Sequence, residues 1–557
     1  MMLSMQISGK QCKMTERVKE LKESEQILDY DVIIVGAGIG GLYQLYKLRE
    51  SGFKVRVFDS ADGVGGTWYW NRYPGARFDS ESYSYGYSFS EELLNEWDWS
   101  EHFASQPEIL KYLEYVSEKF DLIKDIQFGS DVSSAIYDEN GPCWQIQLSD
   151  GRSYKSRFLI TAVGVLSEPV MPKIEGRGSF KGPEFHTSRW PHGGVDYKNK
   201  KVAIIGTGAS GVQTIQELVK DVKHLTVFQR RPNWCAPLHN DRIAKDEMEQ
   251  IRGTYPEIFQ RCHDTVAGFL HSVDSRGTFE VSKEEREKFW EELYASRGFG
   301  IWQGNFNDML TNQEANKEIS DFIARKIRER VNDPETAEKL IPKDHGFGTR
   351  RVPLETKYYE SYNRPNVELV DISESPIERI TENGLRVAGE DYEFDLIIYA
   401  TGFDAIVGSY NRIDVKGADG QTLRGQWEKQ LKTFLGLQVS NFPNMFMVMG
   451  PHALLGNNPR SLEYNAEWIN DLLNYMKEHN FKRAEASESA VDGWAEYVLE
   501  MGQGLLSNEV DSWMTGVNLN LEGRSERIIA RYSGTAQTYR KRCDEVAATG
   551  YKELNLT

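Results

Sequence analysis

The chain has 557 residues, enough for about two to four domains with a sizeable buried core. Hydrophobic residues make up 39% and charged residues 27%, and the formal net charge of -18 argues against nucleic-acid binding, which needs a clustered basic surface. No apolar run reaches the roughly 18 residues of a membrane span. The polar N-terminus has no signal-peptide core, and the five scattered cysteines form no CxxC pair, so we expect a cytoplasmic protein without a membrane span.

The first glycine-rich turn lies in residues 31–59, and the rest of the chain is arranged around it. An apolar run leads into Gly36, Gly38 and Gly41, a helical pattern follows, and a second apolar run ends at Asp59. This order predicts strand, turn, helix and parallel strand, with the glycines allowing a pyrophosphate to approach the helix N-terminus. Asp59 comes 23 residues after Gly36, where a carboxylate binds the hydroxyls of a ribose.

Residues 62–89 are dense in aromatics and glycine, which is typical of an ordered loop packed on a flat group. A flavin ring beside the nucleotide would explain both residue types, although an aromatic core cluster would explain the aromatics alone. After a helix over 107–119, strands are expected at 144–148 and 157–162. The second strand ends in TAVG (161–164), where its backbone would pass close to the cofactor.

Residues 166–197 are rich in proline and glycine, which indicates a linker. The glycine pattern then returns at Gly206, Gly208 and Gly211, so the chain should bind a second dinucleotide. The position 23 residues after Gly206 is the neutral Gln229, followed by Arg230 and Arg231. A guanidinium pair binds a 2'-phosphate that a carboxylate would repel, so we expect FAD at the first unit and NADPH at the second.

Residues 236–334 are helical in pattern, with a capping box at 282–285 and an apolar helix face between Ile319 and Val331. Strands are then expected at 367–370 and 395–400, the second ending in ATGFD (400–404). A loop at 451–462 should shape the substrate pocket.

The predicted fold is therefore α/β, with two Rossmann-like dinucleotide-binding domains, for FAD and NADP, and a helical insertion in the NADP domain. The expected order along the chain is an N-terminal arm (1–29), the first part of the FAD domain (30–165), the linker and first part of the NADP domain (166–235), the insertion (236–334), the second part of the NADP domain (335–390) and the second part of the FAD domain (391–557).

The linker sequence FKGPEFHTSRWP, residues 180–191, matches the pattern FxGxxxHxxxWP with Phe180, Gly182, His186, Trp190 and Pro191 in register. Together with both glycine turns, GGTWYWNRYPGARFD, VFQRRPNW, ATGFD, TFLGL and SWMTGVN, it resembles the Baeyer-Villiger monooxygenases. The resemblance covers nearly the whole chain from residue 30 and is nearest to the branch of cyclohexanone, phenylacetone and steroid monooxygenases.

The resemblance implies that NADPH reduces FAD, that O2 adds to give a flavin C4a-peroxide, and that a small-molecule ketone becomes an ester or lactone, with sulfoxidation as a side reaction. It implies Arg351 as the catalytic arginine and Asp79 as the carboxylate that orients it. Arg350 stands where the family usually has lysine, and either cation suits a 2'-phosphate. We expect His186 to be structural rather than an acid or base, and Phe180 and Trp190 to anchor the linker.

The expected FAD contacts, beyond the glycines and acid of the first unit, are Gly66, Thr67, Trp68, Asp79, Tyr85 and the backbone near Val132. The expected NADP contacts are Arg77, Gly206, Thr207, Gly208, Ala209, Ser210, Gly211, Val212, Arg230, Arg231, Arg350, Arg351 and Trp513. No residue is assigned to a metal, and a monomer is expected.

Three alternatives share the two-nucleotide plan. A disulfide reductase needs a close cysteine pair, which this sequence does not have. A flavin monooxygenase that oxidises nitrogen or sulfur is the nearer rival, and the form of the linker motif with Arg351 favours the ketone oxidant. A redox sensor that binds FAD and NADPH without turning over a substrate is the third. Neither the particular ketone nor its regiochemistry follows from the sequence.

Overall fold

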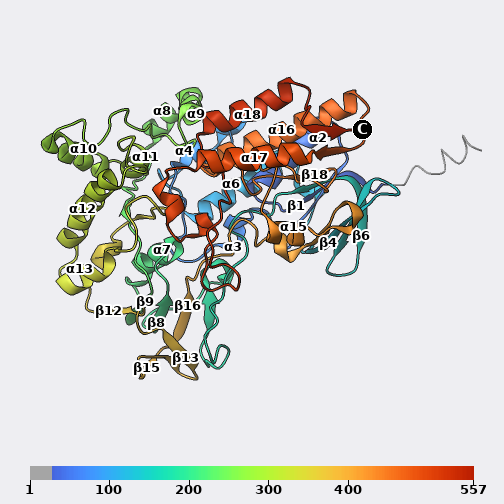
Figure 1. The fold of residues 1–557 in the computed structure, drawn as a ribbon. Coiled ribbons are helices and arrows are strands. Elements are labelled where there is room, and N and C mark those ends of the chain that lie inside the picture. Colours follow the sequence, from blue (N-terminus) through green and yellow to red (C-terminus); the bar gives the residue numbers. More distant parts are fainter. Residues whose placement is uncertain (1–27) are drawn as a thin grey trace, which may run out of the picture.

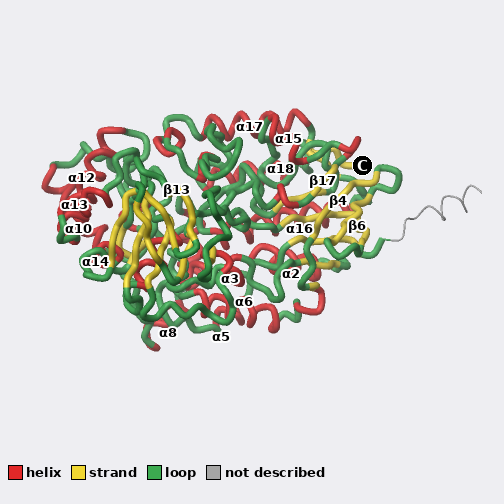
Figure 2. Tube along the Cα trace, turned by 90° about the horizontal axis from the view of Figure 1, so that it is seen from below, coloured by secondary structure: helices red, strands yellow, loops and turns green. Residues whose placement is uncertain are grey.

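The computed structural model describes residues 28–557, so the N-terminal arm expected at 1–29 lies almost entirely outside the described residues. Two sheets form the centres of two lobes, a mixed sheet in the first and a parallel sheet in the second (Figure 1). Figure 2, seen from below, shows the strands of the two sheets as separate groups. Within the described residues, no helix combines the length and apolar character that crossing a membrane requires.

The first sheet is built around β1 (Tyr30–Val35), which pairs in parallel with β2 (Val55–Phe58) on one side and β6 (Ser153–Thr161) on the other. The remaining strands extend the sheet from both edges, and β18 pairs with β6. They are β3 (Ile126–Gln127), β4 (Val132–Asp138), β5 (Cys143–Leu148), β17 (Asp414–Lys416) and β18 (Met445–Met447).

Helices from both ends of the chain cover this sheet. Helix α2 (Ile39–Glu50) packs against α16 (Asn458–Glu478), and Leu45 and Leu472 are fully buried in the shared core. The other elements of this lobe are α3 (Thr67–Trp70), α4 (Ser82–Tyr85), α5 (Glu91–Glu96), α6 (Gln106–Lys119), η1 (Ile123–Asp125), η3 (Tyr410–Arg412), η4 (Ala418–Gly420), α15 (Leu423–Lys429), α17 (Glu488–Met501), η5 (Leu506–Glu509), η6 (Trp513–Thr515), α18 (Ala536–Ala548) and the strand pair β19 (Ala484–Ala486) and β20 (Leu554–Leu556).

The second sheet repeats this arrangement. Its strands run parallel in the order β12, β9, β8, β16, β7. They are β7 (Glu184–His186), β8 (Lys201–Ile205), β9 (His224–Gln229), β12 (Val367–Asp371) and β16 (Leu396–Tyr399), with α7 (Ala209–Leu218) following β8 and η2 (Thr187–Arg189) following β7. A small antiparallel sheet of β13 (Ile377–Thr381), β14 (Gly384–Val387) and β15 (Glu390–Glu393) precedes β16.

One expected domain boundary differs from this topology. We expected the chain to return to the first domain at residue 391, but β16 pairs with β8 from Leu396 to Tyr399, so the second sheet continues beyond that point. The chain next pairs with the first sheet at β17, which begins at Asp414. The boundary was placed too early because the sequence of a buried apolar strand does not indicate which sheet the strand joins.

The insertion is helical and lies at the far end of the second lobe in Figure 1. The capping box of Ser282 and Glu285 is formed at the start of the helix Lys283–Ala295. Asp333 caps the helix Pro334–Leu340. Its elements are α8 (Lys245–Gly253), α9 (Tyr255–Asp264), α10 (Lys283–Ala295), α11 (Gly300–Gln303), α12 (Gln313–Arg330) and α13 (Pro334–Leu340), and the chain then passes through β11 (Leu354–Glu355), which pairs with β10 (Ala236–Pro237), and α14 (Tyr358–Ser361).

Candidate active site

The first glycine turn is tightly packed against the end of β6. Gly36 has φ +107°, and a Cβ added there would lie 2.5 Å from the carbonyl oxygen of Ala162. A Cβ at Gly41 would lie 1.9 Å from the carbonyl oxygen of Gly36. Only glycine fits either position, so the helix α2 N-terminus and its free amides come close to β1 as a pyrophosphate site requires.

Asp59 stands at the end of β2 above this turn. One carboxylate oxygen accepts a hydrogen bond from the Ala37 amide at 2.6 Å, and the other accepts one from the Ala61 amide at 2.8 Å. Burial raises the pKa of Asp59, and the two amides oppose that shift. The carboxylate is thus fixed beside the glycine turn, where it fits the ribose of FAD.

The aromatic segment folds over the same turn. Gly66 has φ +54°, and a Cβ added there would lie 2.8 Å from the Cα atom of Gly38. The indole Nε1 of Trp68 donates to the Tyr85 hydroxyl at 3.1 Å, and the Tyr85 ring stacks on Phe78 with 4.3 Å between centroids. These aromatics form an ordered wall, which fits a flat isoalloxazine ring.

The second glycine turn repeats the first in its backbone. Gly206 has φ +108°, and a Cβ there would lie 2.5 Å from the carbonyl oxygen of Ala400; a Cβ at Gly211 would lie 2.3 Å from the Gly206 carbonyl oxygen. Ala400 in ATGFD therefore supports the second turn as Ala162 in TAVG supports the first. Gly208, by contrast, has no atom within 4 Å of an added Cβ.

The side chain at the acidic position of the second unit points away from the turn. Gln229 is 1% exposed, and its amide donates to the Lys339 carbonyl oxygen at 2.8 Å. The residue at the end of β9 is therefore neutral and does not repel a phosphate on the ribose.

Two guanidinium groups face the Asp344 carboxylate at this end of the second unit, and Arg230 lies near both of them. Asp344 lies 3.8 Å from Arg231 Nε and 3.1 Å from Arg350 Nη2. Burial, together with the charges of Arg231 and Arg350, lowers the pKa of Arg230. Three cations with one acid leave net positive charge, which fits the 2'-phosphate of NADP. The sequence reading did not identify Asp344.

The ion pair between Arg351 and Asp79 joins the two lobes. Arg351 Nη2 donates to Asp79 Oδ2 at 2.6 Å, and the Asp79 side chain is nearly fully buried. Burial raises the pKa of Asp79, and the charge of Arg351 opposes this shift. Arg351 Nη1 is buried without a hydrogen-bond partner among the described residues, so the guanidinium keeps a free donor.

Gln213 on α7 supports this pair, and sequence reasoning missed it. Its amide nitrogen donates to the Arg77 carbonyl oxygen at 3.0 Å and approaches Asp79 Oδ1 at 3.4 Å. Its amide oxygen accepts from the Tyr73 hydroxyl at 2.8 Å. One side chain of the second unit thus holds the loop of the first unit that carries Asp79. The only available sequence signal is its place two residues after Gly211, on the first turns of a helix that faces the other lobe.

A cavity of about 880 Å³ connects both glycine turns. It is lined by fifteen of the predicted site residues: Gly36, Gly38, Asp59, Gly66, Thr67, Trp68, Arg77, Asp79, Tyr85, Val132, Gly208, Ala209, Ser210, Arg351 and Trp513. The other predicted residues do not line it: Gly41, Gly206, Thr207, Gly211, Val212, Arg230, Arg231 and Arg350. The cavity also has walls that were not predicted, from the insertion (Phe269, Phe299, Trp302) and from the C-terminal region (Leu505, Ser507, Arg531).

The linker histidine lies apart from this chemistry. His186 is 5% exposed, its Nδ1 accepts the Ser188 amide at 3.1 Å, and burial lowers its pKa to about 4. Phe180 and Trp190 are also buried. These surroundings fit the structural role expected for His186 better than that of an acid or base.

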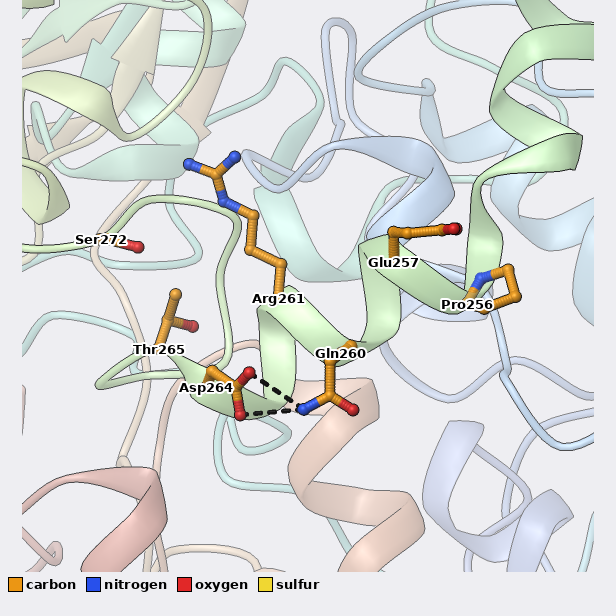
Figure 3. Close-up of a pocket in the computed structure, with 7 residues that line it drawn as sticks. All are labelled: Pro256, Glu257, Gln260, Arg261, Asp264, Thr265 and Ser272. Atoms are coloured by element: carbon orange, nitrogen blue, oxygen red, sulfur yellow. Dashed lines mark hydrogen bonds between the residues drawn. The ribbon is translucent and has the colours of Figure 1, made fainter.

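A second pocket, of about 550 Å³, is lined by helix α9 and the segment that follows it, mainly by polar and charged side chains (Figure 3). Its Asp264 carboxylate accepts two hydrogen bonds from Gln260, at 3.0 and 2.9 Å. It shares no lining residue with the large cavity, so it contributes nothing to the site described above.

Two glycine turns, a carboxylate at one, arginines at the other and one cavity between them define a flavoprotein oxidoreductase that uses FAD and NADP. A family model for pyridine nucleotide-disulphide oxidoreductases matches residues 33–266. The chain is 44% identical over 534 residues to 2-oxo-Δ(3)-4,5,5-trimethylcyclopentenylacetyl-CoA monooxygenase from Pseudomonas putida, covering 94% of this chain and 98% of that protein. It is 40% identical over 532 residues to phenazine N-monooxygenase PhzNO1 from Lysobacter antibioticus, covering 95% and 97%.

A crystal structure of OTEMO in complex with FAD and NADP superposes with a TM-score of 0.92 at 44% identity, covering 96% of this chain and all of that one. Identity at this level over nearly the full length of the relatives shows that the chain belongs to the Baeyer-Villiger monooxygenases, which are FAD-containing, NADPH-dependent oxidoreductases. The resemblance found in the linker motif is confirmed.

Proposed function

We propose that the large cavity oxidises a small ketone to an ester or lactone, with Arg351 as the catalytic arginine and Asp79 as its orienting carboxylate. FAD reduced by NADPH supplies the oxygen-activating chemistry when it is bound. The chain's own residues bind both nucleotides, place the ketone, exclude water and hold a fixed positive charge beside the reacting oxygen.

The observation that carries this proposal is the free Nη1 donor of Arg351. Asp79 holds the guanidinium through its other nitrogen, so one N–H group stays available to stabilise negative charge that develops on oxygen. The carboxylate also keeps the guanidinium from leaving the junction of the two units. The aromatic and apolar walls, including Phe269 and Trp302, limit the entry of water.

The nucleotide contacts are part of the same proposal. Gly36, Gly38, Gly41 and Asp59 bind FAD, and Arg230, Arg231 and Arg350 bind the 2'-phosphate of NADPH. The proposal includes action as a monomer. The four described cysteines are buried and none of them forms a disulfide, which fits a cytoplasmic location. Size-exclusion chromatography with light scattering tests the oligomeric state.

The test is NADPH consumption by the purified yellow holoprotein with and without cyclic, aryl and steroid ketones, with product analysis. Arg351→Ala should leave flavin reduction by NADPH measurable and reduce ester formation by a factor on the order of a thousand or more. Arg364→Ala, at an exposed arginine of the same lobe, is the matched control. An unchanged ester yield in Arg351→Ala would contradict the assignment.

N-oxidation is the second candidate function, because a phenazine N-monooxygenase is 40% identical to this chain. Aromatic amines and N-heterocycles belong in the same assay. Substrate-dependent NADPH consumption with these compounds and none with ketones would favour N-oxidation, and no response to either class would indicate a sensor.

A further inference from the structure

The C-terminal segment 529–534 is fixed against the loop expected to shape the pocket. The His452 amide donates to the Ala530 carbonyl oxygen at 2.9 Å, and the Tyr532 amide donates to the Ala453 carbonyl oxygen at 3.0 Å. Tyr532 is 1% exposed, and its ring stacks on Trp494 with 5.5 Å between centroids. The backbone on either side of Arg531 is therefore held rigidly.

Arg531 lines the large cavity without a counter-charge. Its Nη2 donates to the Ser507 hydroxyl at 3.1 Å, and its Nε is buried without a hydrogen-bond partner. Within residues 28–557, no carboxylate lies within 4.0 Å of its guanidinium nitrogens, whereas Arg77, Arg351 and Arg412 in the same cavity each face one. A guanidinium stays charged in proteins, so Arg531 brings an unbalanced positive charge to the cavity wall.

A second polar group of the cavity wall, two residues after Arg531, also lacks a hydrogen-bond partner among the described residues. The Ser533 hydroxyl is buried without a partner among the described residues, and both Ser507 and Ser533 line the cavity. Burying an unpaired charge and hydroxyl is costly unless a ligand satisfies them. One guanidinium and two hydroxyls match the charge and hydrogen-bonding capacity of one carboxylate.

The Arg531 site is connected by direct contacts to the catalytic end of the cavity. Leu506, next to Ser507, donates its amide to the Leu310 carbonyl oxygen at 2.9 Å. A Cβ at Gly348 would lie 2.8 Å from Trp302 and 3.3 Å from Leu310, and Gly348 is three residues before Arg351. Apolar side chains such as Leu310, Trp302 and Leu505 line the same cavity.

We propose that Arg531, with Ser507 and Ser533, binds a carboxylate on the substrate, so that the natural substrate is a keto acid. The inference rests on the proposed ketone oxidation and adds the substrate class. The carboxylate pairs with Arg531, the carbon skeleton packs on the apolar wall, and the ketone carbonyl is turned toward Arg351. A neutral ketone leaves the Arg531 charge buried and unpaired, and therefore binds more weakly.

The experiment compares 2-oxocyclopentaneacetic acid with its methyl ester, which have the same ring and ketone but differ in charge. With the holoenzyme, kcat/KM for the acid should exceed that for the ester by about tenfold or more, as expected for a charge-assisted hydrogen bond. In Arg531→Met the ratio should fall to about one, and Arg531→Lys should keep part of it. Arg542→Met, at an exposed arginine of α18, is the matched control and should keep the wild-type ratio.

Binding is measured separately from turnover, by the change in the flavin absorbance spectrum when the oxidised holoenzyme is titrated with the acid or the ester. The acid should bind about tenfold more tightly than the ester, and Arg531→Met should remove that difference. Ser533→Ala is the second variant, with a smaller loss expected, and it keeps the inference testable if Arg531→Met does not fold.

Three results would overturn the keto-acid assignment: equal use of acid and ester by the wild type, an equal loss for both in Arg531→Met, or a rise in the KM for NADPH as the main effect of that variant. These results leave ketone oxidation itself standing. Arg531-dependent binding of the acid without any ester or lactone product would instead reject the proposed function and keep the anion site.

Discussion

The two nucleotide-binding units share one backbone design but differ in what covers it. At the first unit, the aromatic loop brings Gly66 so close that a Cβ on Gly38 would lie 3.5 Å from the Gly66 Cα atom. At the second unit, nothing lies within 4 Å of a Cβ on Gly208. The chain packs over the first turn and leaves open space at Gly208 of the second, which suits a resident FAD and an NADPH that exchanges in each catalytic cycle.

The two units also differ in the charge at the end of their second strand. Asp59 accepts hydrogen bonds from two backbone amides beside the first turn. Gln229 instead turns toward α13, and Arg231 and Arg350 lie at Asp344 near the second turn. The charge at the end of the second strand therefore fits an unphosphorylated ribose at the first unit and a 2'-phosphate at the second.

Among tests of the difference between the two units, Asp59→Ala is expected to have the largest effect, a loss of bound FAD. The change removes the ribose ligand and leaves the Ala37 and Ala61 amides unpaired, at a cost of about 1–3 kcal/mol for each buried group. The purified variant should therefore have lost most of its FAD, measured as flavin absorbance per protein. Glu50→Gln, exposed at the end of α2, should keep full occupancy, and equal flavin content in both variants would refute the role of Asp59.

The second largest effect is expected on NADPH binding at the second unit. Arg230→Ala should raise the KM for NADPH by about ten- to a hundredfold, because one charge-assisted contact to the 2'-phosphate is lost. The KM for NADH should change little, since NADH has no such phosphate. Steady-state kinetics with both nucleotides give the answer, and a similar rise for both would remove Arg230 from the phosphate site.

A pair of glycine variants tests how the two turns are covered. Gly66→Ala should lower the free energy of unfolding by about 1–3 kcal/mol, because Gly66 has a positive φ and no room for Cβ. Gly208 has φ -76° and open space, so Gly208→Ala should leave the free energy of unfolding almost unchanged and raise only the KM for NADPH. Denaturant unfolding followed by flavin fluorescence measures both, and equal destabilisation would argue against different enclosure.

The smallest effect concerns acid stability of the second lobe. The pKa of His186 is lowered to about 4 in the folded protein, below the unfolded value of about 6.5, so the unfolded state binds more protons between these values. Stability contributed by His186 is complete above that window and falls as the pH drops through it, by about 1 kcal/mol between about pH 7.5 and about pH 5.5.

His186→Asn keeps an acceptor for the Ser188 amide but does not titrate, so it should flatten the pH dependence of the unfolding free energy by that amount. Urea unfolding at the two pH values measures the slope. A variant with the wild-type slope would show that His186 does not cause it.

Much of the fold and part of the site could be predicted from the sequence. Glycines that must lie close to backbone, such as Gly36 and Gly206, leave a local signal because no other residue fits. Asp344 and Arg531 left none, and Gln213 left only its place after Gly211. Their roles depend on contacts with residues elsewhere in the chain, from 24 positions away for Arg531 and Ser507 to 136 for Gln213 and Arg77. The sheet to which β16 belongs was misjudged for the same reason, since strand pairing is a long-range property.

The contact between Arg351 and Asp79 has a consequence for the timing of the reaction. The arginine comes from the lobe of the second sheet and the aspartate from the lobe of the first, with Gln213 bridging them. A swing of one lobe relative to the other would separate the pair and withdraw the positive charge from the reaction chamber. If Arg351 has the role proposed above, substrate oxidation therefore requires contact between the two lobes.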